Sequence, residues 1–329
     1  MRIPRGRAAV GRGRRRAAAA IALAVAVTGC GAGAGSGEAG QQSSPGADGY
    51  PVTVQTRHGE VTIEEGPSRV LALGFAAADE ALSLGVTPVA VAADPGTLET
   101  ATPWLAEELA GIADPGLVSA DGGPNLEAIA SVAPDLILAE TYQVPDTTTF
   151  EQLNAIAPTV APDSEAANVD WDTRLRTTAR ALRREEEAEE LITDISAAFA
   201  EVGAPVPDIG SRTYQWVRAD PGRYAFGNGS VLELFGLRPA DNQDNTQTGD
   251  PLPLERTEEL DADVLMVWAP TGEDRDRLAG DPLFQELPAV EASTVYYADL
   301  AFANALNSPA PIGLDWLRGE LEPVIGQLS

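Results

Sequence analysis

The hydrophobic positions of this chain change their period several times. Residues 51–63 alternate between apolar and polar around His58-Gly59, which predicts a short antiparallel hairpin. After Pro67, short apolar runs typical of buried strands alternate with segments of helical period. This alternation predicts parallel sheets covered by helices, so the expected fold class is α/β.

The alternating pattern fills two regions. In the first, strands are predicted at 70–73, 86–91, 136–139 and 159–160, and helices at 76–84, 126–132 and 150–157. In the second, strands are predicted at 214–217, 264–268 and 295–297, and helices at 231–235, 277–287 and 311–325. We therefore expect two α/β lobes, at 50–168 and 204–329, each with a central sheet.

The longest helical pattern lies between the two regions. Residues 171–202 place apolar side chains near a period of 3.6, and no Gly or Pro interrupts them. A helix of about 30 residues is roughly 45 Å long, more than the width of one lobe. We expect one rigid helix at 169–203 that joins the lobes, with a ligand cleft between them. Its arginines, Arg174 among them, are expected to pair with surface acids.

The two lobes also contain similar segments. Glu127 lies eight residues before Asp135, and Glu255 lies eight residues before Asp263. In each copy the Glu opens a predicted short helix and the Asp precedes an apolar run. The repeat indicates that the lobes share a local plan of helix and buried strand.

The charge distribution indicates export. The formal net charge is −28, yet seven of the arginines lie within residues 1–16, before any acid. The apolar run at 17–27 is too short to cross a bilayer, which takes about 20 residues. Residues 1–29 are therefore predicted as a signal peptide. The run Arg14–Arg16 leaves both the general secretory route and the twin-arginine route open.

The only cysteine of the chain ends this segment. Val27-Thr28-Gly29-Cys30 resembles the bacterial lipobox, in which the Cys thiol is lipidated and becomes the new N-terminus. A diacylglyceryl group supplies two acyl chains, enough to anchor the protein on the outer face of the cytoplasmic membrane. Residues 30–49, rich in Gly, Ala and Ser, are predicted as a flexible tether. The alternative is an ordinary cleaved signal with an incidental thiol.

Composition excludes several classes of function. An acidic surface repels phosphates, so nucleic acid is not an expected partner. One Cys and one His rule out a disulfide framework and a histidine-rich zinc or manganese site. No Gly-x-Ser-x-Gly or His-Glu-x-x-His motif occurs, which weakens the alternative of an exported enzyme. An envelope scaffold is a further, weaker alternative.

Several ordered motifs resemble one protein family. They are Val70–Gly74, Ala81–Val89, Asn125–Ile129 with Pro134–Ile137, and the ending Ala303–Pro309. Together they resemble the helical-backbone (class III) substrate-binding proteins of ABC importers, and most closely the iron(III)-siderophore-binding lipoproteins of high-GC Gram-positive bacteria. The resemblance implies a monomeric binding protein without catalysis or resident cofactor, which closes by small movements around a ferric siderophore that itself holds the iron.

The resemblance also implies a site for the membrane permease. In this family one Glu on each lobe forms a salt bridge with permease arginines, and the two positions fall on Glu127 and Glu255. An associated ATPase then opens the cleft. The alternative is that both acids only stabilise the positive end of a helix. For the C-terminal lobe, Glu258 or Glu233 is an alternative docking residue to Glu255.

A ferric siderophore requires flat aromatic walls and a few cations, which are arginines in a chain without Lys. Aromatic residues and arginines occur together most densely in residues 212–226. If 214–217 is a strand, Arg218–Arg223 lies on the loop at its carboxyl end, where open α/β sheets bind ligands. The candidate ligand-binding residues are Trp216, Arg218, Arg223, Tyr142, Trp268, Tyr224, Phe302 and Trp104.

Other ligands and details stay open at this point. Aromatic walls with Arg also suit haem or cobalamin, and Tyr142 or Tyr224 is a candidate ligand of haem iron. The acidic charge of the chain makes a neutral hydroxamate chelate as credible as a tricatecholate. The acidic loop 241–250 is expected to be a solvated connection, with a cleft rim as the alternative.

Overall fold

The computed structural model describes residues 49–120, 122–164, 166, 169–247 and 249–329. The predicted signal peptide, Cys30 and nearly all of the predicted tether lie outside the described residues. Within the described part of the chain, no helix has the length and apolar character needed to span a membrane.

The N-terminal lobe contains a four-stranded parallel sheet. Its strand order is β4 (Ala90–Val91), β3 (Val70–Ala72), β5 (Leu136–Leu138) and β6 (Thr159–Val160). The main connecting helices are α1 (Phe75–Ser83), α4 (Leu126–Val132) and α5 (Thr147–Asn154). Shorter helices are α2 (Leu98–Ala101), η1 (Pro103–Leu105), α3 (Ala106–Leu109), η2 (Pro115–Leu117) and η3 (Thr141–Gln143).

The predicted elements of this lobe are confirmed with small changes. The hairpin consists of β1 (Val52–Thr56) and β2 (Gly59–Ile63), paired antiparallel. The predicted strand at 86–91 is reduced to its last two residues. The Asn125 side chain caps α4, because its Oδ1 accepts a hydrogen bond from the N–H of Ala128 at 3.3 Å.

The C-terminal lobe contains a mixed sheet. Its path runs β10 (Leu252–Pro253), β8 (Arg223–Phe226), β7 (Thr213–Asp220), β11 (Val264–Trp268) and β12 (Val295–Ala298), and β9 (Arg238–Pro239) also pairs with β7. Strands β7, β11 and β12 are parallel, whereas β8 is antiparallel to β7 and to β10. The lobe thus has a parallel centre with an antiparallel hairpin beside it.

The predicted helices of this lobe at 231–235 and 311–325 are present, and the one at 277–287 is divided. The helices of the lobe are η4 (Ile209–Ser211), η5 (Ser230–Phe235), η6 (Leu254–Glu259), α8 (Gly272–Gly280), α9 (Pro282–Gln285), α10 (Pro288–Glu291), α11 (Leu300–Asn307), α12 (Pro311–Ile325) and η7 (Gly326–Leu328). The predicted helix 277–287 is divided at Asp281, which ends α8 and caps α9. Helix α12 has the predicted bounds.

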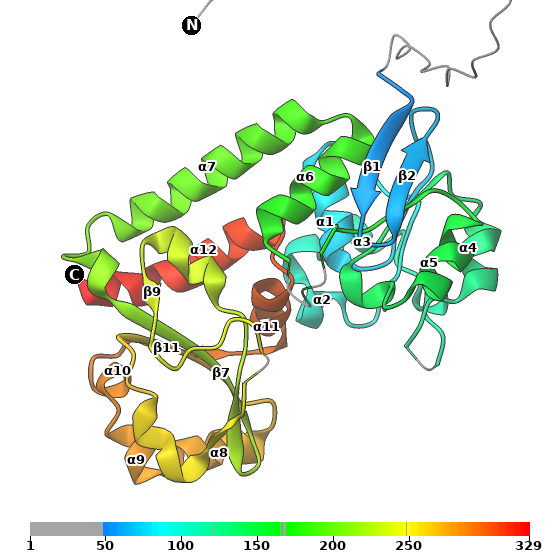
Figure 1. Ribbon diagram of the computed structural model, residues 1–329. Helices are drawn as coiled ribbons and strands as arrows, with labels where there is room; N and C mark the ends of the chain where they lie inside the picture. The colour runs from blue at the N-terminus through cyan, green and yellow to red at the C-terminus, as the bar shows by residue number, and fades with distance from the viewer. Residues whose placement is uncertain (1–48, 121, 165, 167–168, 248) are drawn as a thin grey trace, which may run out of the picture. The chain divides into compact units, whose positions relative to one another are not determined.

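The predicted single helix between the lobes is wrong in one respect. The segment forms α6 (Trp171–Leu182) and α7 (Glu185–Gly203), which contact each other (Figure 1). The chain leaves the helix at Arg183, which has a left-handed φ of 56°. Hydrophobic period does not show this break, because the residues on both sides keep their apolar faces. The long helix is therefore α7, about 28 Å in length.

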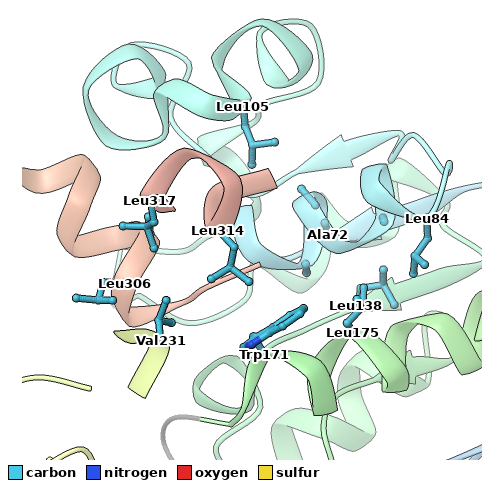
Figure 2. Packing of buried hydrophobic residues seen from close by; sticks show 14 of the residues in the cluster. Ala72, Leu84, Leu105, Leu138, Trp171, Leu175, Val231, Leu306, Leu314 and Leu317 are labelled. Carbon is cyan, nitrogen blue, oxygen red and sulfur yellow. The ribbon is translucent and has the colours of Figure 1, made fainter. Parts of the chain in front are cut away.

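One buried cluster connects the N-terminal lobe with the C-terminal helices. Figure 2 shows Trp171 of α6 in the cluster that also contains Leu314 and Leu317 of α12, Leu306 of α11 and Val231 of η5. Helix α12 contacts both α1 and α7. The described residues belong to one compact unit, and the domain boundaries at 168 and 203 stay predictions.

Candidate ligand-binding site

A cavity of about 210 Å³ lies on the C-terminal sheet, at the ends of β7, β8 and β11. Residues from these strands, from the loop after β9 and from the end of α11 line it. They are Trp216, Arg218, Ala225, Phe226, Gly227, Gln247, Trp268 and Asn307. Three of the eight predicted ligand-binding residues are therefore brought together: Trp216, Arg218 and Trp268.

Arg218 is held over an aromatic ring. It is paired with Trp268 in the register of β7 and β11, and its Cζ lies 5.0 Å from the centroid of the Trp268 ring. Its Nε lies 2.8 Å from Oδ1 of Asp220 in an ion pair, while half of the side chain is exposed. The guanidinium is thus fixed in orientation, with its Nη atoms available for a ligand.

The expectation that Arg218 lies on a loop is wrong. Strand β7 continues to Asp220 because β8 pairs with it antiparallel, from Val217 opposite Phe226 to Asp220 opposite Arg223. Arg218 lies two residues after Trp216, so the two side chains share one face of the strand. This face of the hairpin forms the cavity wall.

Trp216 forms the floor of the cavity. The side chain is 1% exposed, its ring packs edge-on against Phe302, and its Nε1 lies 3.4 Å from Oδ1 of Asn307. A Cβ at Gly227, directly after β8, would come within 2.1 Å of Nε1, so the close approach of the backbone to the Trp216 ring requires glycine there. Phe302 is fully buried beneath Trp216 and supports the floor without lining the cavity.

The N-terminal lobe contributes Tyr142, which follows β5 in η3 and is 60% exposed. Its hydroxyl lies 3.5 Å from Oε1 of Glu140. Burial of the hydroxyl raises the pKa of Tyr142, and the Glu140 carboxylate raises it further, so the phenol keeps its proton. Glu140 accepts a hydrogen bond from Ser308 at 3.0 Å, next to the cavity residue Asn307. Segment 307–308 thus connects the cavity to Tyr142.

Besides Phe302 and Tyr142, three more predicted residues do not line this cavity. Tyr224 is fully buried in the core behind the sheet, with its hydroxyl 3.2 Å from Thr257, because alternation along β8 turns it inward. Arg223 is exposed at the hairpin turn, where its Nε lies 3.9 Å from Asp220. Trp104 packs against Trp316, with ring centroids 5.1 Å apart, between η1 and α12.

Two polar lining residues had no recognised signal in the sequence. Asn307 lies within the ending 303–309 that carries the family resemblance, but nothing local marks its side chain as a cavity residue. Gln247 belongs to the acidic loop 241–250, so part of that loop is a rim rather than only a solvated connection. Both positions depend on how distant segments meet.

Arg174 is buried, contrary to its expected place on the surface. Its Nη1 lies 3.3 Å from Oε2 of Glu140, its Nη2 lies 3.7 Å from Oε1 of Glu80, and it also donates to the carbonyl of Pro309. Burial raises the pKa of Glu80 to about 7, although Arg174 opposes this shift. The charge of Arg174 is therefore engaged by carboxylates of the N-terminal lobe.

The two acids predicted for permease docking are both exposed. Glu127 lies in the first turn of α4, and Glu255 lies in the first turn of η6, a 3₁₀ helix with a kink at Arg256. In the described part of the chain, no group of three or more His, Cys, Asp or Glu side chains is placed to hold a metal ion. His58 instead stacks on Phe150 and contacts the carbonyl of Val144 at 2.9 Å.

Two α/β lobes, a long helix and a cavity at the strand ends define a solute-binding protein. The family model described as periplasmic binding protein matches residues 70–301, and the chain belongs to this family. The fold class predicted from the sequence is confirmed, and the family is one of binding proteins rather than enzymes.

Named relatives are similar over most of the chain. The "Fe(3+)-citrate-binding protein YfmC" of Bacillus subtilis is 28% identical over 253 residues, covering 75% of this chain and 78% of that protein. The "Probable siderophore-binding lipoprotein YfiY" of the same organism is 28% identical over 266 residues, covering 72% and 76%. A periplasmic solute binding protein from Mycobacterium smegmatis has a similar crystal structure, with a TM-score of 0.71 and 27% identity, covering 84% and 98%.

Proposed function

We propose that this protein is the extracytoplasmic substrate-binding component of an ABC importer and that it captures a ferric siderophore. One observation carries the proposal: a single cavity joins a guanidinium fixed over Trp268 to the edge of Trp216. The names of two relatives, "Fe(3+)-citrate-binding protein YfmC" and "Probable siderophore-binding lipoprotein YfiY", support the same class of ligand.

The arrangement suits capture without chemistry. The Trp268 ring offers flat apolar area to an organic chelator. The Nη atoms of Arg218 donate charge-assisted hydrogen bonds to chelate oxygens, and the amides of Gln247 and Asn307 add neutral ones. The chelator itself holds the iron, so the protein moves no proton and breaks no bond.

The geometry argues against the haem alternative. Tyr224 is in the core, where its hydroxyl faces Thr257 rather than the cavity. Tyr142 lies in η3 and does not line the cavity, so it is not placed beside a haem bound there. Cobalamin binding requires no tyrosine ligand, and the titration described below tests it.

Delivery completes the proposal. The loaded protein docks on a permease through Glu127 and Glu255, and the ATPase of the importer drives release. The protein is exported, works as a monomer and is anchored to the outer face of the cytoplasmic membrane by lipid on Cys30. Arg–carboxylate pairs on two separate lobes fix the docking orientation, which a single pair would not do.

Titration of the purified protein tests this function. Tryptophan fluorescence is followed while ferric hydroxamates, ferric catecholates, ferric citrate, haem and cobalamin are added in turn. We expect quenching with micromolar or tighter affinity for a ferric siderophore, weakened at least tenfold in Arg218→Ala. Arg238→Ala is the matched control, since Arg238 is an exposed arginine of the same lobe outside the cavity lining. Binding of haem or cobalamin alone would contradict the proposal.

A further inference from the structure

The cavity carries little net positive charge. Arg218 is the only charged side chain among the eight described residues that line it. Its Nε is paired with Asp220, whose side chain is only 16% exposed. An ion pair that is partly shielded from water interacts more strongly than one in bulk solvent, so much of the Arg218 charge is already compensated.

Asp220 is itself held in place. It ends β7 opposite Arg223 in the hairpin register, and its backbone carbonyl accepts a hydrogen bond from Arg277 at 3.2 Å. Its second carboxylate oxygen lies 3.9 Å from Arg223, which is 57% exposed and therefore well screened by water. The closer contact of Asp220, at 2.8 Å, is with the cavity arginine.

The surroundings of the cavity add negative charge. The loop that supplies Gln247 contains Asp241, Asp244 and Asp250 and no basic residue between positions 241 and 250. On the N-terminal lobe, Arg174 is buried between Glu80 and Glu140 and has no free charge to offer. A strongly anionic ligand would thus meet one compensated cation, beside a loop of negative formal charge.

Ferric chelates differ in charge in a way that this site distinguishes. Three hydroxamates lose one proton each and cancel the charge of Fe³⁺, which leaves a neutral complex. Three catecholates lose two protons each, which leaves a charge of −3. A neutral complex takes hydrogen bonds from Arg218, Gln247 and Asn307 without bringing a charge that the site must balance.

On the basis of the proposed function, we infer that this cavity selects ferric chelates of low net charge over trianionic ones. Asp220 is the residue that sets this selection, through its pair with Arg218. It acts as a positioning and specificity-determining residue and does not itself line the cavity.

Two chelates of opposite class test the inference. Dissociation constants are measured for a neutral ferric cyclic trihydroxamate, such as ferrichrome, and for a trianionic ferric cyclic tricatecholate. We expect the wild type to bind the neutral chelate at least tenfold more tightly. In Asp220→Asn the affinity for the tricatecholate is expected to rise at least tenfold, while the affinity for the trihydroxamate changes by less than about threefold. Asp261→Asn is the control, because Asp261 is an exposed acid of the same lobe and this variant has the same net charge as Asp220→Asn.

The wild type alone provides a second measurement that does not depend on a folded variant. Added salt is expected to strengthen tricatecholate binding, because it screens the repulsion by the acids, and to leave trihydroxamate binding unchanged. A preference for the tricatecholate, or equal effects of Asp220→Asn and Asp261→Asn, would overturn the inference alone. If the folded protein bound neither chelate, the inference would fail, and the proposed function would fail as well if no other ferric chelate bound.

Discussion

Asp135 and Asp263 perform the same task in the two lobes. Each directly precedes a central strand, β5 or β11, and accepts a hydrogen bond from the N–H of a residue at the start of the neighbouring strand. The donors are Arg69, at 2.7 Å from Asp135, and Thr213, at 2.8 Å from Asp263. The repeat noticed in the sequence therefore has a structural basis, since one carboxylate ties a pair of parallel strands in each sheet.

Removing either carboxylate is expected to destabilise its lobe. Asp263→Ala should lower the free energy of unfolding by about 1–3 kcal/mol, because the Thr213 N–H loses its acceptor. Asp135→Ala should have a similar effect, and the two losses should add, because the sites share no partner. Urea denaturation measures both. Asp261→Ala, at an exposed acid, is expected within about 0.5 kcal/mol of wild type, and equal losses in all three variants would contradict the assignment.

These carboxyls also predict a dependence on acid. Partial burial raises the pKa of Asp135 and Asp263, but the N–H and O–H donors outweigh it, and both pKa values end below the ordinary 3.8. Their stabilisation is therefore present above this value and is lost as pH falls through the lowered pKa. We expect the difference between wild type and the double variant to shrink in denaturation measured below pH 3.8.

The stabilisation by Glu80 is expected to depend on pH in the direction opposite to that of Asp135 and Asp263. Its Oε2 accepts from Thr178 at 2.6 Å, and Arg174, Glu140 and Asp79 are the charged groups around it. Burial raises its pKa from 4.5 to about 7, so the folded state keeps a proton that the unfolded state releases within this window. Stability from this group is complete below 4.5 and is lost as pH rises toward 7.

Glu80→Gln removes this titration while it keeps the shape of the side chain. Relative to the variant, the wild type should lose up to about 3 kcal/mol of unfolding free energy between pH 4.5 and about 7. Denaturation curves at several pH values measure the difference. Parallel pH profiles for the two proteins would show that Glu80 titrates normally.

Gly203 predicts a site where a single methyl group is not tolerated. It ends α7, and a Cβ there would lie 1.9 Å from the carbonyl oxygen of Phe235 in η5. Because backbone must move to make room, Gly203→Ala is expected to cost about 1–3 kcal/mol of stability. Gly319→Ala within α12 is the control, since nothing lies near its added Cβ and alanine favours helix by up to about 1 kcal/mol. Thermal denaturation of the two variants should shift in opposite directions.

The docking proposal predicts a separation of binding from transport. The double variant Glu127→Arg with Glu255→Arg should bind the ferric siderophore as tightly as wild type, because both side chains are exposed and outside the cavity lining. Uptake of radioactive iron by cells that carry only this variant should be abolished, because permease arginines would meet like charge.

The controls for docking are Glu107→Arg and Glu273→Arg, which reverse exposed acids in the first turns of α3 and α8. They also reverse an acid in the first turn of a helix, so they separate docking from the alternative that Glu127 and Glu255 only favour a helix end. Normal uptake in the Glu127 and Glu255 variant, or equal loss in the control, would exclude these two acids as the contact.

Local signals in the sequence determined the fold class. The hairpin at 51–63, the bounds of α12 and the cap at Asn125 follow from alternation, helical period and capping chemistry, each of which acts within a few residues. The same is true of the Glu and Asp repeat. Arg218, Trp216 and Trp268 were found as cavity residues because aromatic and basic residues gather near predicted strand ends.

The tertiary structure alone decided which side chains turn inward and where elements stop. Strand β7 extends past Val217 because β8 pairs with it, and the helix expected at 171–202 breaks at Arg183. Arg174 is buried because acids from distant segments, Glu80 and Glu140, surround it. These outcomes depend on contacts between residues far apart in the chain, and a local hydrophobic pattern contains no information about which distant partner each residue meets.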